Sequence, residues 1–315
     1  MSDSATLITA QPNTQAVKRS RLSLWREIFR ARWAYLFIAP FFVFFLLFSL
    51  YPISFSLYLS LTEWKGLGPI KFIGLDNYQR LLGDTVFWQS MLNGVLLFFM
   101  YVPAMTLLAL VIAVILNSKR VRGFRVFRTI IFMPYITNMV AAGFVFRLLL
   151  NSSNGLVNQG LGALGLSPVP WLDSIGGARV SLCLLIVWAW LGYNMMIMLA
   201  GLQTISADLT EAARIDGANN LNVFAYITLP LMRPVLTFSV VLSTIGSFGL
   251  FTEVSILTSG GNPMNATITP IVAIFNQTFG NFRLGYGSAM SYVYFAFILV
   301  LTLFQMRYLS QGEES

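Results

Sequence analysis

Long apolar stretches of the chain carry polar and aromatic side chains that could bind a small polar ligand. The candidates are Trp190, Tyr193, Asn194, Ser243, Ser247 and Glu253. Aromatic faces can stack against a ligand ring, and amide, hydroxyl and carboxylate groups can hydrogen-bond its polar atoms. Close helix packing is the alternative for the serines, because Ser239, Ser243 and Ser247 recur every four residues. The aromatic residues could likewise be ordinary membrane packing, and Asn138 is a further candidate in another stretch.

Several kinds of catalytic chemistry lack the residues they need. The chain has no histidine, which removes imidazole acid–base chemistry and histidine–metal sites. Its single cysteine, Cys183, lies in an apolar run and cannot form a disulfide within the chain. None of the four lysines follows a glycine-rich phosphate-binding loop. The sequence therefore predicts no enzymatic catalysis and no cofactor or metal bound by this chain.

The elements that position the candidate residues must lie in a membrane. Of the 315 residues, 57% are hydrophobic and 10% are charged, whereas soluble domains carry about 25% charged residues. The mean hydropathy is +0.72. Too few polar side chains remain to cover a water-facing surface, so we expect an all-α integral membrane protein. The net charge of +8 does not indicate nucleic acid, because the basic residues flank apolar segments.

Six apolar segments are each long enough to cross a hydrocarbon core about 30 Å thick. They are residues 33–61, 91–116, 130–150, 180–202, 228–257 and 285–309. Prolines in or near several of them predict kinks. The chain is expected to comprise a cytoplasmic tail with an interfacial helix (1–32), a six-span domain (33–309) and a short tail (310–315).

The distribution of Lys and Arg predicts the orientation. Six basic residues lie in the N-terminal tail and five in the loop 117–129. With the segment 203–233 and the C-terminal end, fourteen lie on one side of the membrane and six on the other, which places both termini in the cytoplasm. The loops 62–90 and 151–179 are then external, and Asp76 is a candidate N-cap of a surface helix.

The cytoplasmic loop between the fourth and fifth segments has the most specific pattern in the chain. Asp208 and Glu211 resemble a capping box, so a helix is expected to begin there, and Gly217 is a natural helix stop. A second helical stretch is expected from about Asn219, with Pro230 disturbing its continuation. The resulting short, exposed helix could transmit motion from a docked partner to the spans.

The residues of this loop, within 206–230, also match a known motif. Glu-Ala-Ala is followed after three residues by Gly, and after nine more by Ile-x-Leu-Pro. The positions are Glu211, Ala212, Ala213, Gly217, Ile227, Leu229 and Pro230, with Asp216 beside the glycine. The pattern resembles the EAA loop of permease subunits of bacterial ATP-binding-cassette (ABC) importers. Residues 74–78 and 257–263 are similar to the carbohydrate permeases of the maltose and glycerol-phosphate importer group.

The resemblance implies a type I ABC importer permease fold with six transmembrane helices and a cytoplasmic coupling helix, in the bacterial inner membrane. A second permease chain would complete the pathway as a heterodimer, and two ATPase subunits, which bind ATP and Mg, would dock on the EAA helices. An external binding protein would deliver a carbohydrate. Glu211 and Asp216 would contact the ATPase groove, while Ala212, Ala213 and Gly217 would allow close approach and chain reversal. The sugar pocket of such permeases lies at mid-depth between spans four and five.

Glu253 is the only acid well inside a segment, and Arg147 is a candidate ion-pair partner. Glu253 either meets solvent near the external end of span five or contributes to the pathway. A stand-alone secondary transporter or channel is the alternative function, with Glu253 as its coupling residue, although no internal repeat is evident. A membrane-embedded enzyme would need a nucleophile–base pair that is not found. The lack of an arginine cluster within the spans favours a neutral sugar over a phosphate ester.

Overall fold

The computed structural model describes residues 32–118 and 123–310. The expected interfacial helix before residue 32, the tail after residue 310, and Lys119, Arg120 and Arg122 of the basic loop lie outside the described residues. By its internal contacts the chain divides into two units, one ending at Phe55 and the other beginning at Ser56. The units are described separately.

The first unit is helical throughout its described part. Helix α2 (Arg32–Phe45), the π-helical turn η1 (Leu46–Leu50) and α3 (Tyr51–Ser60) follow one another without a break. This 29-residue stretch is long and apolar enough to cross a membrane, as the first expected span requires. No side chain of α2 or η1 is buried. Apolar side chains on such a helix are suited to a hydrocarbon environment.

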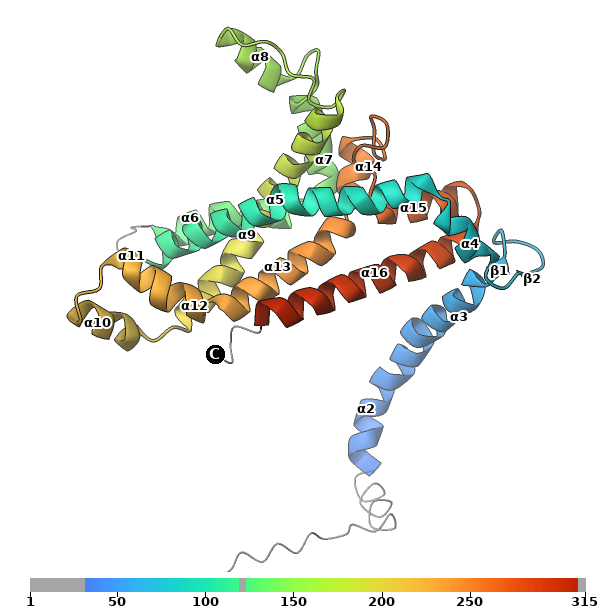
Figure 1. The fold of residues 1–315 in the computed structure, drawn as a ribbon, viewed down its shortest axis with the longest axis horizontal. Helices are drawn as coiled ribbons and strands as arrows, with labels where there is room; N and C mark the ends of the chain where they lie inside the picture. The colour runs from blue at the N-terminus through green and yellow to red at the C-terminus, as the bar shows by residue number, and fades with distance from the viewer. Residues whose placement is uncertain (1–31, 119–122, 311–315) are drawn as a thin grey trace, which may run out of the picture. The chain divides into compact units, whose positions relative to one another are not determined.

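The second unit is a helical bundle (Figure 1). Its long helices are α5 (Thr85–Asn117), α9 (Ile175–Gln203), α13 (Arg233–Phe248) and α16 (Leu284–Ser310). Helix α5 contacts α9 and α13, and α13 also contacts α16. The shorter elements are β1 (Thr62–Glu63), β2 (Lys71–Phe72), α4 (Asp76–Leu82), α6 (Phe124–Phe132), η2 (Met133–Ile136), α7 (Met139–Leu149), α8 (Leu156–Ala163), α10 (Ala207–Ile215), α11 (Asn220–Val223), η3 (Phe224–Thr228), α12 (Leu229–Leu231), α14 (Thr252–Leu257), α15 (Pro270–Phe275) and η4 (Asn276–Gly280).

Six spans result only when two bent helix pairs count as one span each. Four single helices among the described residues are long and apolar enough to cross a membrane. The pair that joins α6–η2 to α7 bends by 94°, and the pair that joins α11–α12 to α13 bends by 63°. The third and fifth expected spans are therefore not straight helices, and the fifth is interrupted again between α13 and α14.

The breaks have identifiable causes in the sequence. Pro134 lies in the first turn of η2, and Asn138 starts α7 anew, because its side-chain oxygen accepts hydrogen bonds from the backbone N–H groups of Val140 and Ala141 at 2.9 and 3.2 Å. Asn138 is thus a helix cap, which explains its polar side chain. In the second pair, Pro230 and Pro234 flank the bend, where a proline lacks the N–H that continues a helix.

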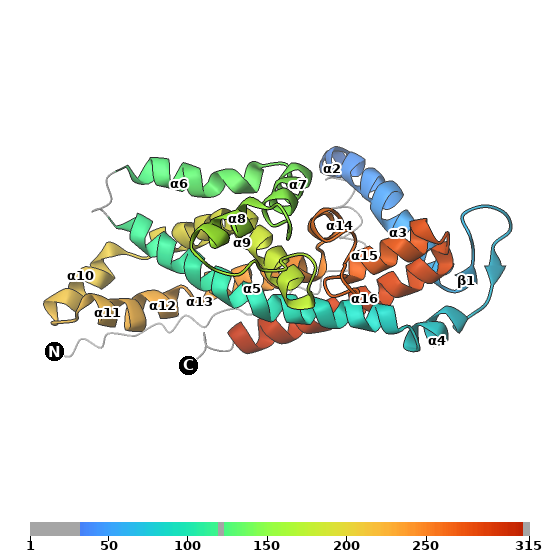
Figure 2. The same cartoon turned by 90° about the horizontal axis from the view of Figure 1, so that it is seen from above.

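The two ends of the second unit carry different elements. Helix α10 lies at one end, and α4 and the antiparallel β1–β2 pair lie at the other (Figures 1 and 2). We expected Asp76 to be the N-cap of α4. It lies instead in the first turn of the helix, directly after Leu75. The next residue, the buried Asn77, ties this first turn to the end of α3 and to β1, because its side chain donates to the carbonyls of Ser60 and Thr62 at 2.9 and 2.8 Å.

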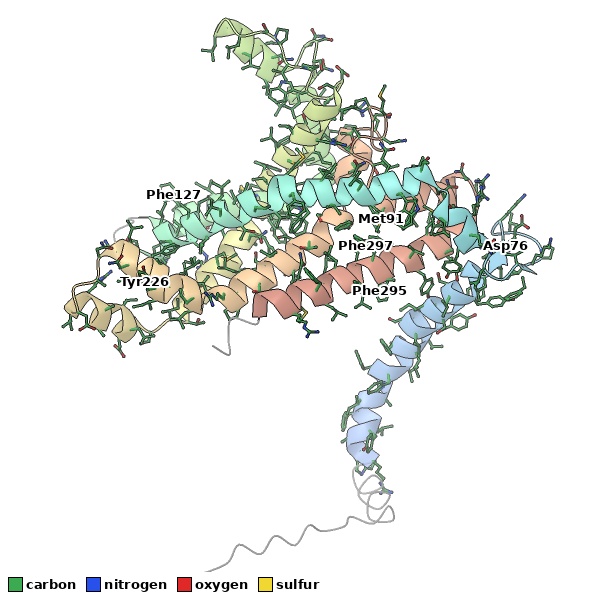
Figure 3. All side chains as sticks on the ribbon, viewed as in Figure 1. Asp76, Met91, Phe127, Tyr226, Phe295 and Phe297 are labelled. Atoms are coloured by element: carbon green, nitrogen blue, oxygen red, sulfur yellow. The ribbon has the colours of Figure 1, made fainter. Side chains whose placement is uncertain are left out.

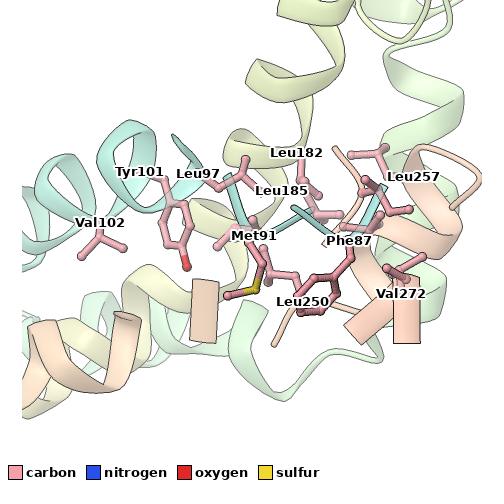
Figure 4. Packing of buried hydrophobic residues seen from close by; sticks show 14 of the residues in the cluster. Phe87, Met91, Leu97, Tyr101, Val102, Leu182, Leu185, Leu250, Leu257 and Val272 are labelled. Carbon is pink, nitrogen blue, oxygen red and sulfur yellow. The ribbon is translucent and has the colours of Figure 1, made fainter. Parts of the chain in front are cut away.

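The apolar core joins α5 and α9 to the chain after α13. Figure 4 shows this packing, with Phe87, Met91 and Leu97 of α5, Leu182 and Leu185 of α9, and Leu250, Leu257 and Val272 from the later segments. On α16, Phe297 packs against Phe248 with ring centroids 5.5 Å apart, whereas Phe295 is 60% exposed (Figure 3). The bundle therefore has an internal face and a face suited to lipid.

Candidate functional site

A cavity of about 400 Å³ lies between η2, the middle of α5, α9, α13 and the start of α14. This volume is typical of sites for small ligands. Five of the six candidate ligand-binding residues line it: Trp190, Tyr193, Asn194, Ser243 and Glu253. They come from three helices separated along the chain, so the bundle brings together what the sequence shows as two distant clusters.

Ser247 is the candidate that does not line the cavity. It is fully buried, and its hydroxyl donates to the carbonyl of Thr244 in its own helix at 2.7 Å. The other two serines of the row face α9, because Ser239 and Ser243 both donate to the side-chain oxygen of Asn194, at 2.6 and 3.5 Å. Ser239 therefore serves helix packing, and Ser243 both packs and lines the cavity.

Asn194 joins α9 to α13. Its side chain is 3% exposed, its oxygen accepts from Ser239 and Ser243, and its nitrogen donates to the carbonyl of Trp190 at 3.1 Å. A buried amide without such partners would be costly in free energy. Because these groups are already engaged, the main effect of Asn194 is to hold Ser243 and the Trp190 turn in place.

Tyr135 of η2 is a cavity residue to which the sequence pattern did not point. Its ring stacks on Tyr193 with centroids 4.7 Å apart and meets Trp190 edge-on at 5.3 Å. Close approach of this segment to α9 requires Gly192, because a Cβ there would lie 2.1 Å from the carbonyl oxygen of Ile131. The useful signal was Pro134, which precedes the tyrosine where α6 ends and η2 begins.

Tyr101 of α5 is the second cavity residue that was missed. Its side chain is buried, and its hydroxyl donates to the carbonyl of Ser243 at 3.4 Å. Nothing in the spacing along α5 separates Tyr101 from the lipid-facing aromatic residues nearby. Its role follows only from the contact between α5 and α13.

Glu253 lies at the start of α14 and is 7% exposed. Its carboxylate accepts hydrogen bonds from the Trp190 side chain and from the backbone of Phe251. The expected ion pair with Arg147 is not formed; that guanidinium instead donates to the carbonyl of Ile256 at 3.3 Å. A second cavity of about 550 Å³ also reaches Glu253, Trp190 and Tyr135.

Gly246 supplies part of the space in the first cavity. It lines the cavity, and a Cβ added to it would meet no atom within 4 Å. A larger side chain at this position would therefore extend into free space and occupy the ligand volume. The absence of a side chain at Gly246 therefore leaves room for a ligand.

The cytoplasmic loop forms the short helix α10, as expected, but its cap differs. Ser206 is the N-cap, since its hydroxyl oxygen accepts from the backbone N–H of Asp208 at 3.2 Å, so Asp208 lies in the first turn. Ser206 precedes Asp208 and Glu211 in the chain, so its side chain satisfies a free backbone N–H at the start of the helix. Gly217 ends the helix, as predicted, with a φ of 88°, and Ala218 N–H donates to the carbonyl of Ala213 at 2.9 Å.

The chain continues from Gly217 as predicted. Asn219 caps α11 by accepting from the backbone N–H of Asn222 at 2.8 Å. The later motif residues Ile227, Leu229 and Pro230 lie in η3 and α12, which lead through the 63° bend into α13. The loop is therefore connected in sequence to the helix that carries Ser243 and Gly246.

Helix α10 has no buried residue. Ala212 is exposed, and Ile215 is 87% exposed. Neither Glu211 nor Asp216 forms an ion pair or hydrogen bond through its side chain with any described residue, apart from contacts within its own backbone. Glu211 also lines a polar cleft of about 580 Å³ between α10, α11 and the ends of α5 and α9. Helix α10 therefore presents an exposed surface that carries acidic side chains.

Comparison with known proteins identifies relatives of the whole chain. Residues 105–312 match the family described as binding-protein-dependent transport system inner membrane component. The chain is 40% identical over 290 residues to the lactose transport system permease protein LacF of Rhizobium radiobacter, covering 91% of this chain and 96% of that protein. It is 35% identical over 302 residues to the arabinooligosaccharides transport system permease protein AraP of Bacillus subtilis, covering 95% of each. With the trehalose/maltose transport system permease protein MalF of Thermococcus litoralis the identity is 36% over 279 residues, covering 88% and 93%.

Solved structures share the fold. The crystal structure of a bacterial ABC transporter involved in the import of the acidic polysaccharide alginate has a chain with a TM-score of 0.80 and 22% identity, covering 92% of this chain and 99% of that one. The alginate transporter in complex with an alginate pentasaccharide-bound periplasmic protein gives a TM-score of 0.79 at 21% identity, covering 93% and 99%. At this identity the likeness shows the fold alone.

Proposed function

Because the chain belongs to the family of binding-protein-dependent transport system inner membrane components, we propose that it forms half of the translocation pathway of an ATP-driven carbohydrate importer. The observation that carries this proposal is the cavity, where Tyr135, Trp190 and Tyr193 present aromatic faces beside Ser243 and Glu253. Aromatic faces stack on the C–H faces of sugars, and the hydroxyl and carboxylate groups hydrogen-bond sugar hydroxyls. The relatives named for lactose, arabino-oligosaccharides and trehalose or maltose support the same substrate class.

Helix α10 is the proposed docking site for an ATPase subunit. Its exposed small residues allow close approach, and its acidic side chains, which form no ion pair with the described residues, are available for contacts with the partner. ATP and Mg would be bound by that partner, and a second permease chain would complete the pathway as a heterodimer. An external binding protein would dock at the end of the unit that carries α4. In this proposed orientation both termini would lie in the cytoplasm, as the distribution of basic residues predicts.

Coupling follows from the connection between α10 and the cavity. A displacement of α10 is passed through Gly217, α11 and α12 to α13, whose residues Ser243 and Gly246 line the cavity. Closure of two ATPase subunits would move the α10 helices of both permease chains together and switch the cavity between the two sides of the membrane. Such rigid-body alternation needs no coupling ion in this chain.

The alternative, a secondary transporter or channel acting alone, would depend on Glu253 as a coupling residue. Membership of a binding-protein-dependent family favours the multi-subunit importer instead. Family membership also argues against a membrane-embedded enzyme. The two transport mechanisms differ in their energy source, which makes them separable by experiment.

Reconstitution in liposomes tests the proposal. The chain is assembled with its partner permease, ATPase and binding protein, and uptake of labelled lactose and maltotriose is measured with and without internal ATP. We expect uptake to require both internal ATP and the external binding protein. Uptake by the chain alone, driven by an ion gradient, would contradict the proposal and support the stand-alone transporter.

A further inference from the structure

The two cavities share one wall. Tyr135, Trp190 and Glu253 line both the cavity of about 400 Å³ and the cavity of about 550 Å³. The three side chains also contact one another, because Tyr135 meets the Trp190 ring edge-on at 5.3 Å and the Trp190 side chain hydrogen-bonds the Glu253 carboxylate. A ligand in either cavity is therefore next to the same aromatic pair and the same acid.

This wall carries an acid without a compensating cation. Of the described residues that line the two cavities, none is Lys or Arg. The Glu253 carboxylate is 7% exposed and has only neutral hydrogen-bonding partners. Because this carboxylate is so little exposed, solvent screens its repulsion of a like charge only weakly.

Three arginines on α6, α7 and α9 have partners outside the two cavities. Arg128 on α6 donates to the sulfur of Met196, and Arg147 on α7 donates to the carbonyl of Ile256, at 2.9 and 3.3 Å. Arg179 on α9 donates to the carbonyl of Ala266 at 3.0 Å and to the side-chain oxygen of Asn93. Each of these guanidinium groups is thus engaged by a neutral partner, and none of the three arginines lines either cavity.

We propose that the wall of Tyr135, Trp190 and Glu253 makes the pathway selective for neutral saccharides and excludes acidic ones. The proposal rests on the carbohydrate function proposed above and specifies its substrate class. The aromatic pair attracts any sugar ring, whereas the carboxylate repels a uronate or sugar phosphate, so attraction and exclusion are combined in one wall. A transporter of the same fold is involved in the import of the acidic polysaccharide alginate, which shows that the fold itself does not decide the charge of the cargo.

Equilibrium binding to the complete permease–ATPase complex in nanodiscs tests this selectivity without the binding protein. The neutral probes are lactose and maltotriose, and the acidic probes are digalacturonate and trigalacturonate. We expect the wild-type complex to bind the acidic probes more weakly than the neutral ones by about tenfold or more. We expect Glu253→Gln to reduce this difference, because it removes the charge and keeps a hydrogen-bonding group.

Glu63→Gln is the matched control. Glu63 is an exposed residue of β1 that lines neither cavity, so the same substitution there should leave the preference unchanged. Equal binding of acidic and neutral probes by the wild type overturns the proposal, and this comparison needs no variant. An undiminished preference in Glu253→Gln overturns it as well. Absence of binding and of ATPase stimulation with every saccharide would instead defeat the carbohydrate function itself.

Discussion

The cavity and helix α10 differ in how their polar groups are satisfied. Around the cavity, Asn194 is buried and hydrogen-bonded to Ser239, Ser243 and Trp190. On α10 nothing is buried, and the Glu211 side chain has no partner among the described residues. The cavity wall is therefore held by the chain's own packing, whereas the polar side chains of α10 stay exposed, as the proposed docking of an ATPase subunit requires. Substitutions should accordingly act on stability or sugar binding in the first region and on assembly or coupling in the second.

The largest effect on stability is expected at Gly192, where the backbone of α9 lies against the backbone of α6. Gly192→Ala places a Cβ 2.1 Å from the carbonyl oxygen of Ile131, and a backbone atom cannot move aside easily. We expect a loss of about 1–3 kcal/mol in stability, seen as a lower melting temperature of the purified complex. Gly160→Ala in α8, where a Cβ meets nothing within 4 Å, is the matched control. Equal melting temperatures for the two variants would contradict the close backbone contact between Gly192 and Ile131.

A second substitution fills the cavity without disturbing the fold. Gly246→Leu projects a side chain into free space and suits a helix better than glycine does. We expect sugar binding to fall by about tenfold or more through steric exclusion, with the melting temperature unchanged or raised. Calorimetric titration with lactose or maltotriose measures the first quantity and a thermal melt the second. Unaltered binding would remove this cavity from the pathway.

A third substitution acts on α10 alone. Gly217→Ala meets no clash but forces alanine to a φ of 88°, at a cost of about 1 kcal/mol. We expect the end of α10 to shift, so that sugar-stimulated ATP hydrolysis falls while sugar binding persists. Gly217→Asn should retain more activity, because asparagine tolerates this conformation better. Equal sugar-stimulated ATP hydrolysis in Gly217→Ala and the wild type would contradict the proposed role of Gly217 in positioning the end of α10.

The smallest effect separates two neighbouring serines. Ser243→Ala removes a hydroxyl from the cavity wall, whereas Ser247→Ala removes one bonded within its own helix. A lost hydrogen bond is worth about 1 kcal/mol, so we expect weaker sugar binding in the first variant and unchanged binding in the second. The reverse order would show that Ser247, rather than Ser243, faces the ligand.

The same contrast explains what could be predicted from the sequence. Gly217 as helix stop and Asn219 as the start of α11 were correct, because caps depend on residues a few positions apart. The expected helix start at Asp208 was wrong by two residues, because Ser206 is also able to cap and precedes it in the chain. Apolar length likewise located the long helices α5, α9 and α16.

The residues that line the cavity were harder to predict from the sequence. Trp190, Tyr193 and Asn194 stood out because they are clustered along one helix, but Tyr101 and Tyr135 enter only through contacts between distant segments. The position of Tyr135 depends on the close approach at Gly192 and lies next to the 94° bend before α7, whereas Tyr101 depends on the contact between α5 and α13. Proline and glycine signal that a break is possible, but its angle is set by tertiary packing.

The most direct test of the account measures sugar binding and sugar-stimulated ATP hydrolysis on the same reconstituted complexes of Gly246→Leu and Gly217→Ala. The account predicts that Gly246→Leu loses sugar binding while its ATPase subunits remain bound. It predicts that Gly217→Ala keeps sugar binding and loses the stimulation of hydrolysis. If both variants lost both properties together, or if neither variant lost either, the division between a self-contained cavity and a partner-dependent coupling helix would be contradicted.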